Sequence, residues 1–247
     1  YYGWESGSQR MLDVLKKDLT PEVIVEAAKM TRRAGIWAKV YLIVGSPGEN
    51  SPTVDVGLAE VWTIANDRPS RQATLRHGAA ASSDQFGSAV ALAGDWAVVG
   101  ALGRDVNGLN SAGAAYVFRR TGTAWSQVQV LQSTSQTFAG RFGSSVVLAG
   151  PWLAVGAPGE GSDPAGGGAV HIYEQQVNGQ YVFRQRLVPS TASELGYFGW
   201  SLAIDGPMLV IGAPYASAGA GQVWVSMRDG STWSAPERIG SDLEPIA

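Results

Sequence analysis

Residues 142–158, FGSSVVLAGPWLAVGAP, decide the fold of this 247-residue chain, because the pattern occurs three times. A Phe-Gly pair begins at each of Phe86, Phe142 and Phe198, which are equally spaced in the sequence. A Gly-Ala pair follows each of them at the same interval, at positions 100, 156 and 212. The segment between the two pairs alternates apolar residues, as a β-strand with one buried face does. The chain therefore contains a β-rich internal repeat.

Each repeat continues into two more predicted strands. Glycine-led strands begin at positions 113, 168 and 221, and fourth strands run over 125–131, 181–187 and 233–239. Four short strands in about 50 residues are typical of one blade of a β-propeller. We predict blades at about 76–131, 132–187 and 188–239. Leu75 precedes Phe86 by the same interval as Leu131 precedes Phe142. Residues 69–75 are therefore predicted to be the last strand of a blade whose first three strands are absent.

Residues 1–67 have a different composition. All four lysines lie before residue 40, and residues 20–35 have the pattern of a capped helix. Residues 36–44 form an apolar run that predicts a strand buried on both faces, and a second helix is predicted from Ser51 to Ile64. We place a linker at Asn66–Arg68, between a domain at 1–67 and another at 68–247. The predicted fold class is mainly β: an incomplete propeller of three four-stranded blades, preceded by a small α/β fragment.

Composition excludes several classes of site and partner. A 45% hydrophobic fraction and a formal net charge of −3 indicate a globular chain without the basic field that nucleic acid binding needs. No apolar run is long enough to span a bilayer. The chain has no cysteine, which excludes disulfides, cysteine-ligated zinc and a cysteine-held iron–sulfur cluster. Its two histidines, His77 and His171, lie in different repeats, so no histidine-rich metal site is predicted.

The paired Phe-Gly and Gly-Ala motifs resemble the FG-GAP repeat family, which includes the propeller blades of integrin α-chains. The resemblance covers residues 69–239 and implies a binding scaffold at a cell surface or outside the cell. We expect each motif phenylalanine to fill the seam between blades, and Trp96, Trp152 and Met208 to pack in the core. Related blades bind calcium in loops, and one loop here has oxygen-bearing side chains at suitable spacing: Asp105, Asn107 and Asn110. Turn residues that bond to their own backbone explain this loop about as well.

Residues 1–65 resemble the C-terminal half of a radical S-adenosylmethionine core, through Gly-Trp-Glu-Ser at 3–6 and Val-Gly-Ser-Pro-Gly-Glu at 44–49. This resemblance implies a vestigial cofactor site at Glu5, Ser6, Gly45 and Glu49, and a cytoplasmic location. The cysteines that hold the family's cluster are missing, so we expect no iron–sulfur cluster and no cofactor cleavage by this chain. S-adenosylmethionine and the cluster belong only to a longer enzyme of this type.

The resulting functional prediction is a non-catalytic binding or scaffold module for a protein or glycan partner. Calcium is the one candidate ligand ion. The alternatives are a fragment of a radical S-adenosylmethionine enzyme and a non-native join of two genes. Three blades leave two apolar faces uncovered, so we expect either self-association or completion by further blades.

Overall fold

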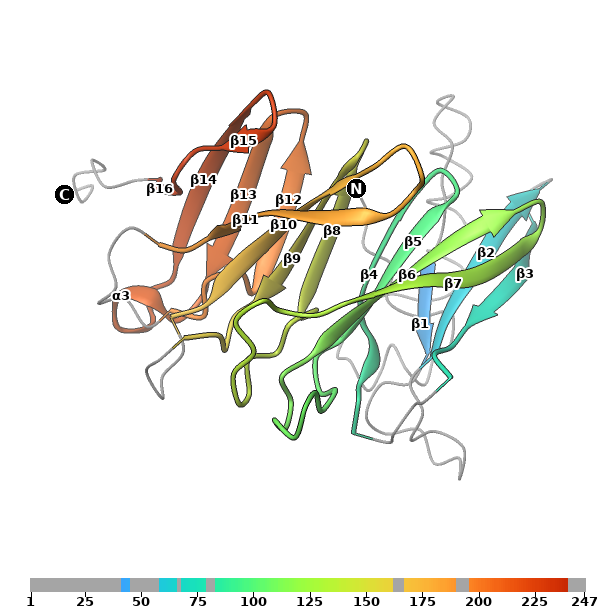
Figure 1. Cartoon of the computed structure of the whole chain (residues 1–247), viewed down its shortest axis with the longest axis horizontal. Coiled ribbons are helices and arrows are strands. Elements are labelled where there is room, and N and C mark those ends of the chain that lie inside the picture. The colour runs from blue at the N-terminus through green and yellow to red at the C-terminus, as the bar shows by residue number, and fades with distance from the viewer. Residues whose placement is uncertain are drawn as a thin grey trace.

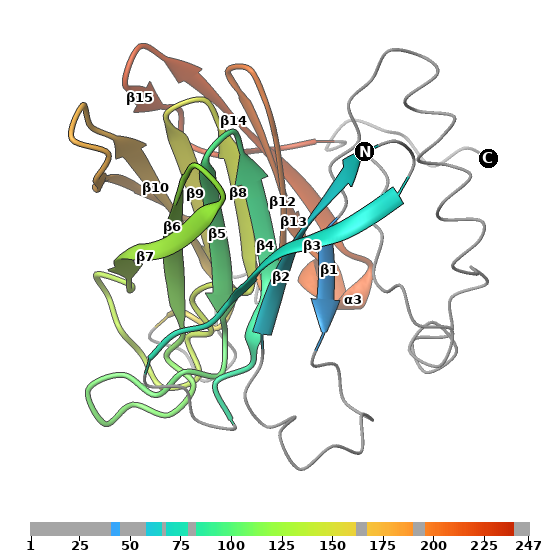
Figure 2. The same cartoon turned by 90° about the vertical axis from the view of Figure 1, so that its right-hand side faces the viewer.

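The computed structural model describes residues 41–44, 58–65, 68–78, 83–161, 167–189 and 196–239. These residues form four antiparallel sheets, which follow one another side by side in chain order (Figure 1). The described chain is mainly β, and its one helical segment is the single turn α3 (Ala216–Gly219) in a loop. The view at 90° shows the neighbouring sheets packed face against face, which is a propeller-like arrangement (Figure 2).

We name the sheets I to IV. Sheet I has the order β1 (Tyr41–Val44), β2 (Leu58–Ala65), β3 (Arg68–Leu75). Sheet II has the order β4 (Phe86–Ala93), β5 (Trp96–Ala101), β6 (Ala114–Thr121), β7 (Ala124–Leu131). Sheet III has the order β8 (Ser145–Ala149), β9 (Trp152–Ala157), β10 (Ala169–Gln175), β11 (Tyr181–Leu187). Sheet IV comprises β12 (Ser201–Asp205), β13 (Met208–Ala213), β14 (Gln222–Asp229), β15 (Thr232–Trp233), β16 (Glu237–Arg238).

Sheets II and III confirm the predicted four-stranded repeats. In sheet IV the predicted fourth strand is divided into β15 and β16, which both pair with β14. Strand β8 contacts β4 on one side and β12 on the other, so the first strands of the three repeats lie next to one another.

The prediction of a helix through Leu58, Val61 and Ile64 is wrong, because these residues lie in strand β2. The run Val61-Trp-Thr-Ile is β-branched and aromatic, which favours a strand, and β2 pairs along its length with β3. Hydrogen bonding to β3 and burial of Ala59 and Val61 therefore override the helical spacing. Strand β3 is correspondingly not an orphan, since β2 and β1 complete its sheet.

The remaining predictions for the N-terminal part have mixed outcomes. A strand does occur within residues 36–44, at β1, and it pairs antiparallel with β2, which stands in place of the second helix of the predicted α/β fragment. The helix over 20–35 lies outside the described residues. The linker at Asn66–Arg68 falls between β2 and β3, which pair with each other. The division into two domains stays a prediction.

Among the described residues, the buried apolar side chains form three clusters, one at each seam between neighbouring sheets. Each cluster contains one motif phenylalanine, and all three are buried: Phe86, Phe142, Phe198. Phe142, for example, belongs to the same cluster as Val98 and Val117 of sheet II and Leu153 of sheet III. The expectation that these phenylalanines fill the seams is confirmed.

The motif glycines allow neighbouring sheets to approach closely. Gly143 and Gly199, which follow the motif phenylalanines, have φ of 91° and 88°, a region that side chains other than glycine rarely adopt. A Cβ on Gly100 would overlap the carbonyl oxygen of Gly143 in the next sheet, and one on Gly156 would overlap that of Gly199. The Gly-Ala pair of one repeat thus contacts the backbone of the Phe-Gly pair of the next repeat.

Polar side chains also join the sheets. The Gln129 amide donates to the carbonyl oxygen of Tyr181 at 2.8 Å and accepts from its N–H at 2.9 Å. Gln185, the equivalent of Gln129 in the next repeat, makes the same pair of bonds to Trp233. Each glutamine therefore holds the outermost strand of the following sheet.

The three residues expected in the core have different environments. Trp152 is buried and meets Trp233 of sheet IV edge to face, with ring centroids 5.9 Å apart. Trp96 is half-buried against Tyr181 of sheet III. Met208 is 38% exposed, because no further described sheet covers it. The prediction holds for Trp152, holds in part for Trp96 and is wrong for Met208.

Candidate functional site

The two ends of the sheets are built differently. At one end the strands are joined by two-residue turns such as Gly94–Asp95, Gly150–Pro151 and Gly206–Pro207. At the other end, the lower side of Figure 1, the connections are longer. We call this the long-loop end and define it by the described residues of 102–113, 132–144, 158–168, 188–200 and 214–221. Loops held by a rigid scaffold are where binding residues concentrate, so the candidate site is sought there.

Sheet III has a buried polar cluster at this end. Glu160, only 1% exposed, accepts hydrogen bonds from Ser133 Oγ at 2.5 Å and from Arg186 Nε at 2.6 Å. His171 Nε2 lies 2.8 Å from Glu160 Oε2 and carries the proton, since an ionised carboxylate only accepts. Burial alone would raise the pKa of Glu160, but its bonds to His171, Ser133 and Arg186 outweigh burial and lower it. The cluster thus keeps the Glu160 carboxylate ionised in the protein interior.

The order of contacts in this cluster is not that of a nucleophile and its base. Ser133 Oγ and His171 Nε2 bind the same carboxylate oxygen and lie 3.4 Å from each other. A triad places the imidazole between hydroxyl and acid, and its hydroxyl must reach substrate. Here the carboxylate stands in the middle and all three side chains are buried. The cluster fastens the loop after β9 to strands β10 and β11.

Sheet II has a related cluster at the same place. Arg104 occupies the position that Glu160 has in the next repeat and donates to Asp84 Oδ2 at 2.8 Å, while His77 Nε2 lies 3.4 Å from the same oxygen. Burial lowers the pKa of His77, against the opposing effect of Asp84, and burial raises the pKa of Tyr116. The His77 ring stacks on Tyr116 with centroids 4.5 Å apart. The equivalent position holds the oppositely charged Arg104 and Glu160 in sheets II and III but the buried Ala216 in sheet IV, so two of the three repeats have a polar anchor here.

The predicted calcium loop is used for internal hydrogen bonds. Asp105 Oδ1 accepts from the Ser111 N–H at 2.8 Å, and the Asn107 amide donates to Gln136 at 2.9 Å. Val106 and Leu109 pair across a turn in which Asn107 has a φ of 52°. Asn110 is exposed beside them. The loop offers one carboxylate, and no group of three or more His, Cys, Asp or Glu occurs within the described residues. Calcium binding here stays a prediction.

The other predicted site residues, Glu5, Ser6, Gly45 and Glu49, lie outside the described residues. The S-adenosylmethionine site inferred from them stays a prediction.

Three aromatic side chains at the long-loop end of sheet IV were not predicted as site residues from the sequence. Tyr197, Trp200 and Tyr215 contact one another edge to face, with centroids 5.3 to 6.1 Å apart. Tyr215 and Trp200 are 55% and 44% exposed. They are detectable in the sequence as departures from the repeat, because the equivalent positions of the other two repeats hold no aromatic residue.

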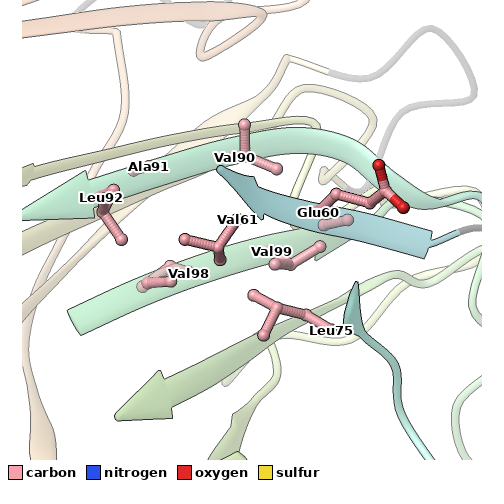
Figure 3. A pocket seen from close by; sticks show the side chains of 10 residues that line it. Glu60, Val61, Leu75, Val90, Ala91, Leu92, Val98 and Val99 are labelled. Atoms are coloured by element: carbon pink, nitrogen blue, oxygen red, sulfur yellow. The ribbon is translucent and has the colours of Figure 1, made fainter. Parts of the chain in front are cut away.

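A small cavity lies away from this end, between sheets I and II (Figure 3). Its lining is apolar apart from Glu60, which is bonded to Arg71 and Trp62. Its volume of about 10 Å³ is room for about one water molecule. This cavity cannot accommodate a substrate.

Comparison with known proteins supports the repeat. Residues 69–118 and 181–226 match the family model described as FG-GAP repeat. The chain is also 38% identical over 53 residues to "Uncharacterized protein MJ1620" of Methanocaldococcus jannaschii, a match that covers 22% of this chain and 10% of the relative. The chain thus spans about a tenth of the length of the curated relative that it matches.

Among solved structures, the periplasmic gluconolactonase PpgL of Pseudomonas aeruginosa is similar at 15% identity and a TM-score of 0.46. The match covers 77% of this chain and 50% of that one. Within the described part of the chain, no helix is long and apolar enough to cross a bilayer. The two segments that match the FG-GAP repeat model include the motif pairs of sheets II and IV.

Proposed function

We propose that this chain is a non-catalytic FG-GAP propeller module that binds a protein or glycan partner through its long-loop end. The proposal rests on the contrast between the two-residue turns at one end of the sheets and the longer loops at the other. Backbone contacts, glutamine bonds and buried phenylalanines hold the sheets together, and the long loops begin directly at these fixed seams. A rigid scaffold of this kind limits the entropy lost when the loops bind a partner.

The arrangement of polar groups agrees with binding. The buried clusters around Glu160 and Asp84 tie the loops to the strands beneath them. Ionisable groups are therefore used within the described long-loop end to order the loops, whereas exposed aromatic and amide side chains, such as Phe138 and Asn107, face solvent. Side chains of those types supply contact area and hydrogen bonds in recognition surfaces.

The test is to probe arrays of immobilised glycans and peptides with the whole chain. Three single variants alter the long-loop end, one each beside sheets II, III and IV: Asn107→Ala, Phe138→Ser and Trp200→Ser. Two control variants, Thr123→Ala and Ser231→Ala, alter exposed residues in the short turns. We expect the whole chain to bind a defined set of array ligands. Its affinity for these ligands should fall at least tenfold in one or more long-loop variants and stay within twofold of the parent value in both controls. Absence of binding to either array, or equal losses at both ends, would contradict the proposal.

A further inference from the structure

Two rings of the aromatic triad of Tyr197, Trp200 and Tyr215 are exposed, those of Trp200 and Tyr215, although large aromatic side chains are normally buried. The three pairwise interplanar angles are 80°, 67° and 84°, so the rings face three nearly perpendicular directions. Tyr197 precedes the motif phenylalanine of sheet IV, and Tyr215 follows its Gly-Ala-Pro segment. Residues from two separate loops of the chain thus form one surface at the long-loop end.

The fold does not require these rings. The backbone is the same in the other repeats: Arg141 has a φ of 54° where Tyr197 has 55°, and the N–H of Gly159 binds the carbonyl of Gly140 as that of Tyr215 binds Gly196. The side chains differ, because Arg141, Ser144 and Gly159 occupy the equivalent positions in sheet III. Gln85, Ser88 and Gly103 occupy them in sheet II. All three positions that meet in space became aromatic in one repeat alone, which indicates a role for the surface that they form.

The two described segments that carry the triad are uncharged. Residues 196–204 and 206–227, which carry the triad, contain no acidic or basic side chain. Other tryptophans are covered by arginines: Arg119 lies over Trp96, and Arg120 over Trp125, at 5.3 and 5.8 Å from the ring centroids. Within the described residues no guanidinium covers Trp200, so its ring keeps an open face.

Resting on the function proposed above, we infer that the triad binds a neutral glycan, with the apolar face of a sugar ring stacked on Trp200. The C–H face of a neutral pyranose is flat and apolar, whereas its edge carries hydroxyl groups. Trp200 supplies an open apolar surface, and the phenol hydroxyls of Tyr197 and Tyr215 supply polar groups beside it. A cationic ligand would gain little, since cation–π attraction is weakest at exposed sites and the two segments offer no carboxylate.

The experiment uses the whole chain and neutral oligosaccharides of glucose, mannose, galactose and xylose. Ligands found on an array are then titrated by calorimetry. Trp200→Ala and Tyr215→Ala should each lower the affinity at least tenfold, and Trp200→Phe should keep it within about threefold because a flat ring remains. Val177→Ala is the control, since Val177 is an exposed apolar residue in the turn between β10 and β11, at the opposite end of the sheets from the triad. Its affinity should equal that of the parent chain.

Salt provides a second readout. Contacts without ionic groups are not screened, so the affinity should stay within twofold between low and high ionic strength. Binding of a proline-rich peptide or a charged glycan instead, or neutral-glycan binding that survives Trp200→Ala, would overturn this inference and leave the function proposed above in place. Failure of the chain to bind any array ligand would overturn both. Unchanged thermal unfolding of each variant shows that a lost affinity is not lost folding.

Discussion

Glu160 is the residue on which the local order of sheet III depends most. Its carboxylate accepts from Ser133, His171 and Arg186, which lie on three different segments. Replacement by alanine would leave a buried imidazole and a partly buried guanidinium without their acceptor. We expect Glu160→Ala to lower the free energy of unfolding by about 3 kcal/mol, measured by urea denaturation.

Glu174→Ala is the matched control for that substitution. Glu174 lies on the same sheet and pairs with Arg184 at 2.8 Å, but both side chains are partly exposed. Such pairs contribute at most about 1 kcal/mol. Equal losses in the two variants would contradict the anchoring role of Glu160.

Because the folded-state pKa of Glu160 is lowered, its stabilisation is present above pH 4.5 and is lost as the pH falls through the folded-state value.

His77 gives a pH prediction of its own. It faces Asp84 and Arg104, and burial lowers its pKa below the ordinary 6.5. The unfolded chain therefore binds a proton that the folded chain does not, and stability attributable to His77 falls as the pH drops below 6.5. An NMR titration should show one imidazole with a pKa below 6.5, and this signal should vanish in His77→Gln. A pKa at or above 6.5 for that imidazole would show that the attraction of Asp84 exceeds the effect of burial.

Single residues were predictable from the sequence only where the repeat marked them. Phe142 and Gly156 stand out because identical residues recur at a fixed spacing, and the structure places them at the seams. Glu160 and Arg186 lie far apart in the sequence, on separate segments, and the pairing that joins them is set by the tertiary fold. The aromatic triad was detectable as a departure from the repeat, but its members meet only in three dimensions.

At the scale of elements, the seam between sheets III and IV depends on glycine. A Cβ on Gly156 would overlap the carbonyl oxygen of Gly199, which is backbone and cannot turn away. We expect Gly156→Ala to cost about 3 kcal/mol through separation of the two sheets, measured by denaturant unfolding. Gly167→Ala is the control, because no atom lies within 4 Å of its Cβ position, and it should change stability by less than about 0.5 kcal/mol. Similar effects of the two substitutions would refute the close contact.

Strands were predicted well inside the repeats and poorly before them. Each strand of a repeat has counterparts at nearly the same spacing in the other two repeats. A weak local pattern is therefore supported by three copies of it. Residues 58–65 have no counterpart, and their apolar positions fit a helix as well as a strand. Pairing with β3 decides between the two, and that pairing is a long-range interaction that local spacing does not encode.

At the scale of the whole molecule, the outer face of sheet IV leaves apolar side chains exposed. Met208 and Met227 lie opposite one another on β13 and β14, and both are exposed. The counterpart of Met208 in sheet III, Trp152, is covered by Trp233 and by Arg228, whose guanidinium lies 5.2 Å from the Trp152 ring centroid. The equivalent place beyond Met208 has no covering sheet among the described residues. Exposed apolar faces of repeat arrays tend to associate.

We therefore expect this chain to self-associate through the outer face of sheet IV in a concentration-dependent way, unless further blades cover that face. Static light scattering should give a mass that rises with concentration for the parent chain. The double variant Met208→Lys with Met227→Lys should stay monomeric, since two like charges placed opposite each other repel an apposed copy. Phe138→Lys, which removes an exposed apolar residue from the long-loop end, should leave the association unchanged. A parent chain that remains a strict monomer at high concentration would contradict this expectation. It would show that the outer face of sheet IV is stable in water without the kind of cover that sheet IV gives to Trp152.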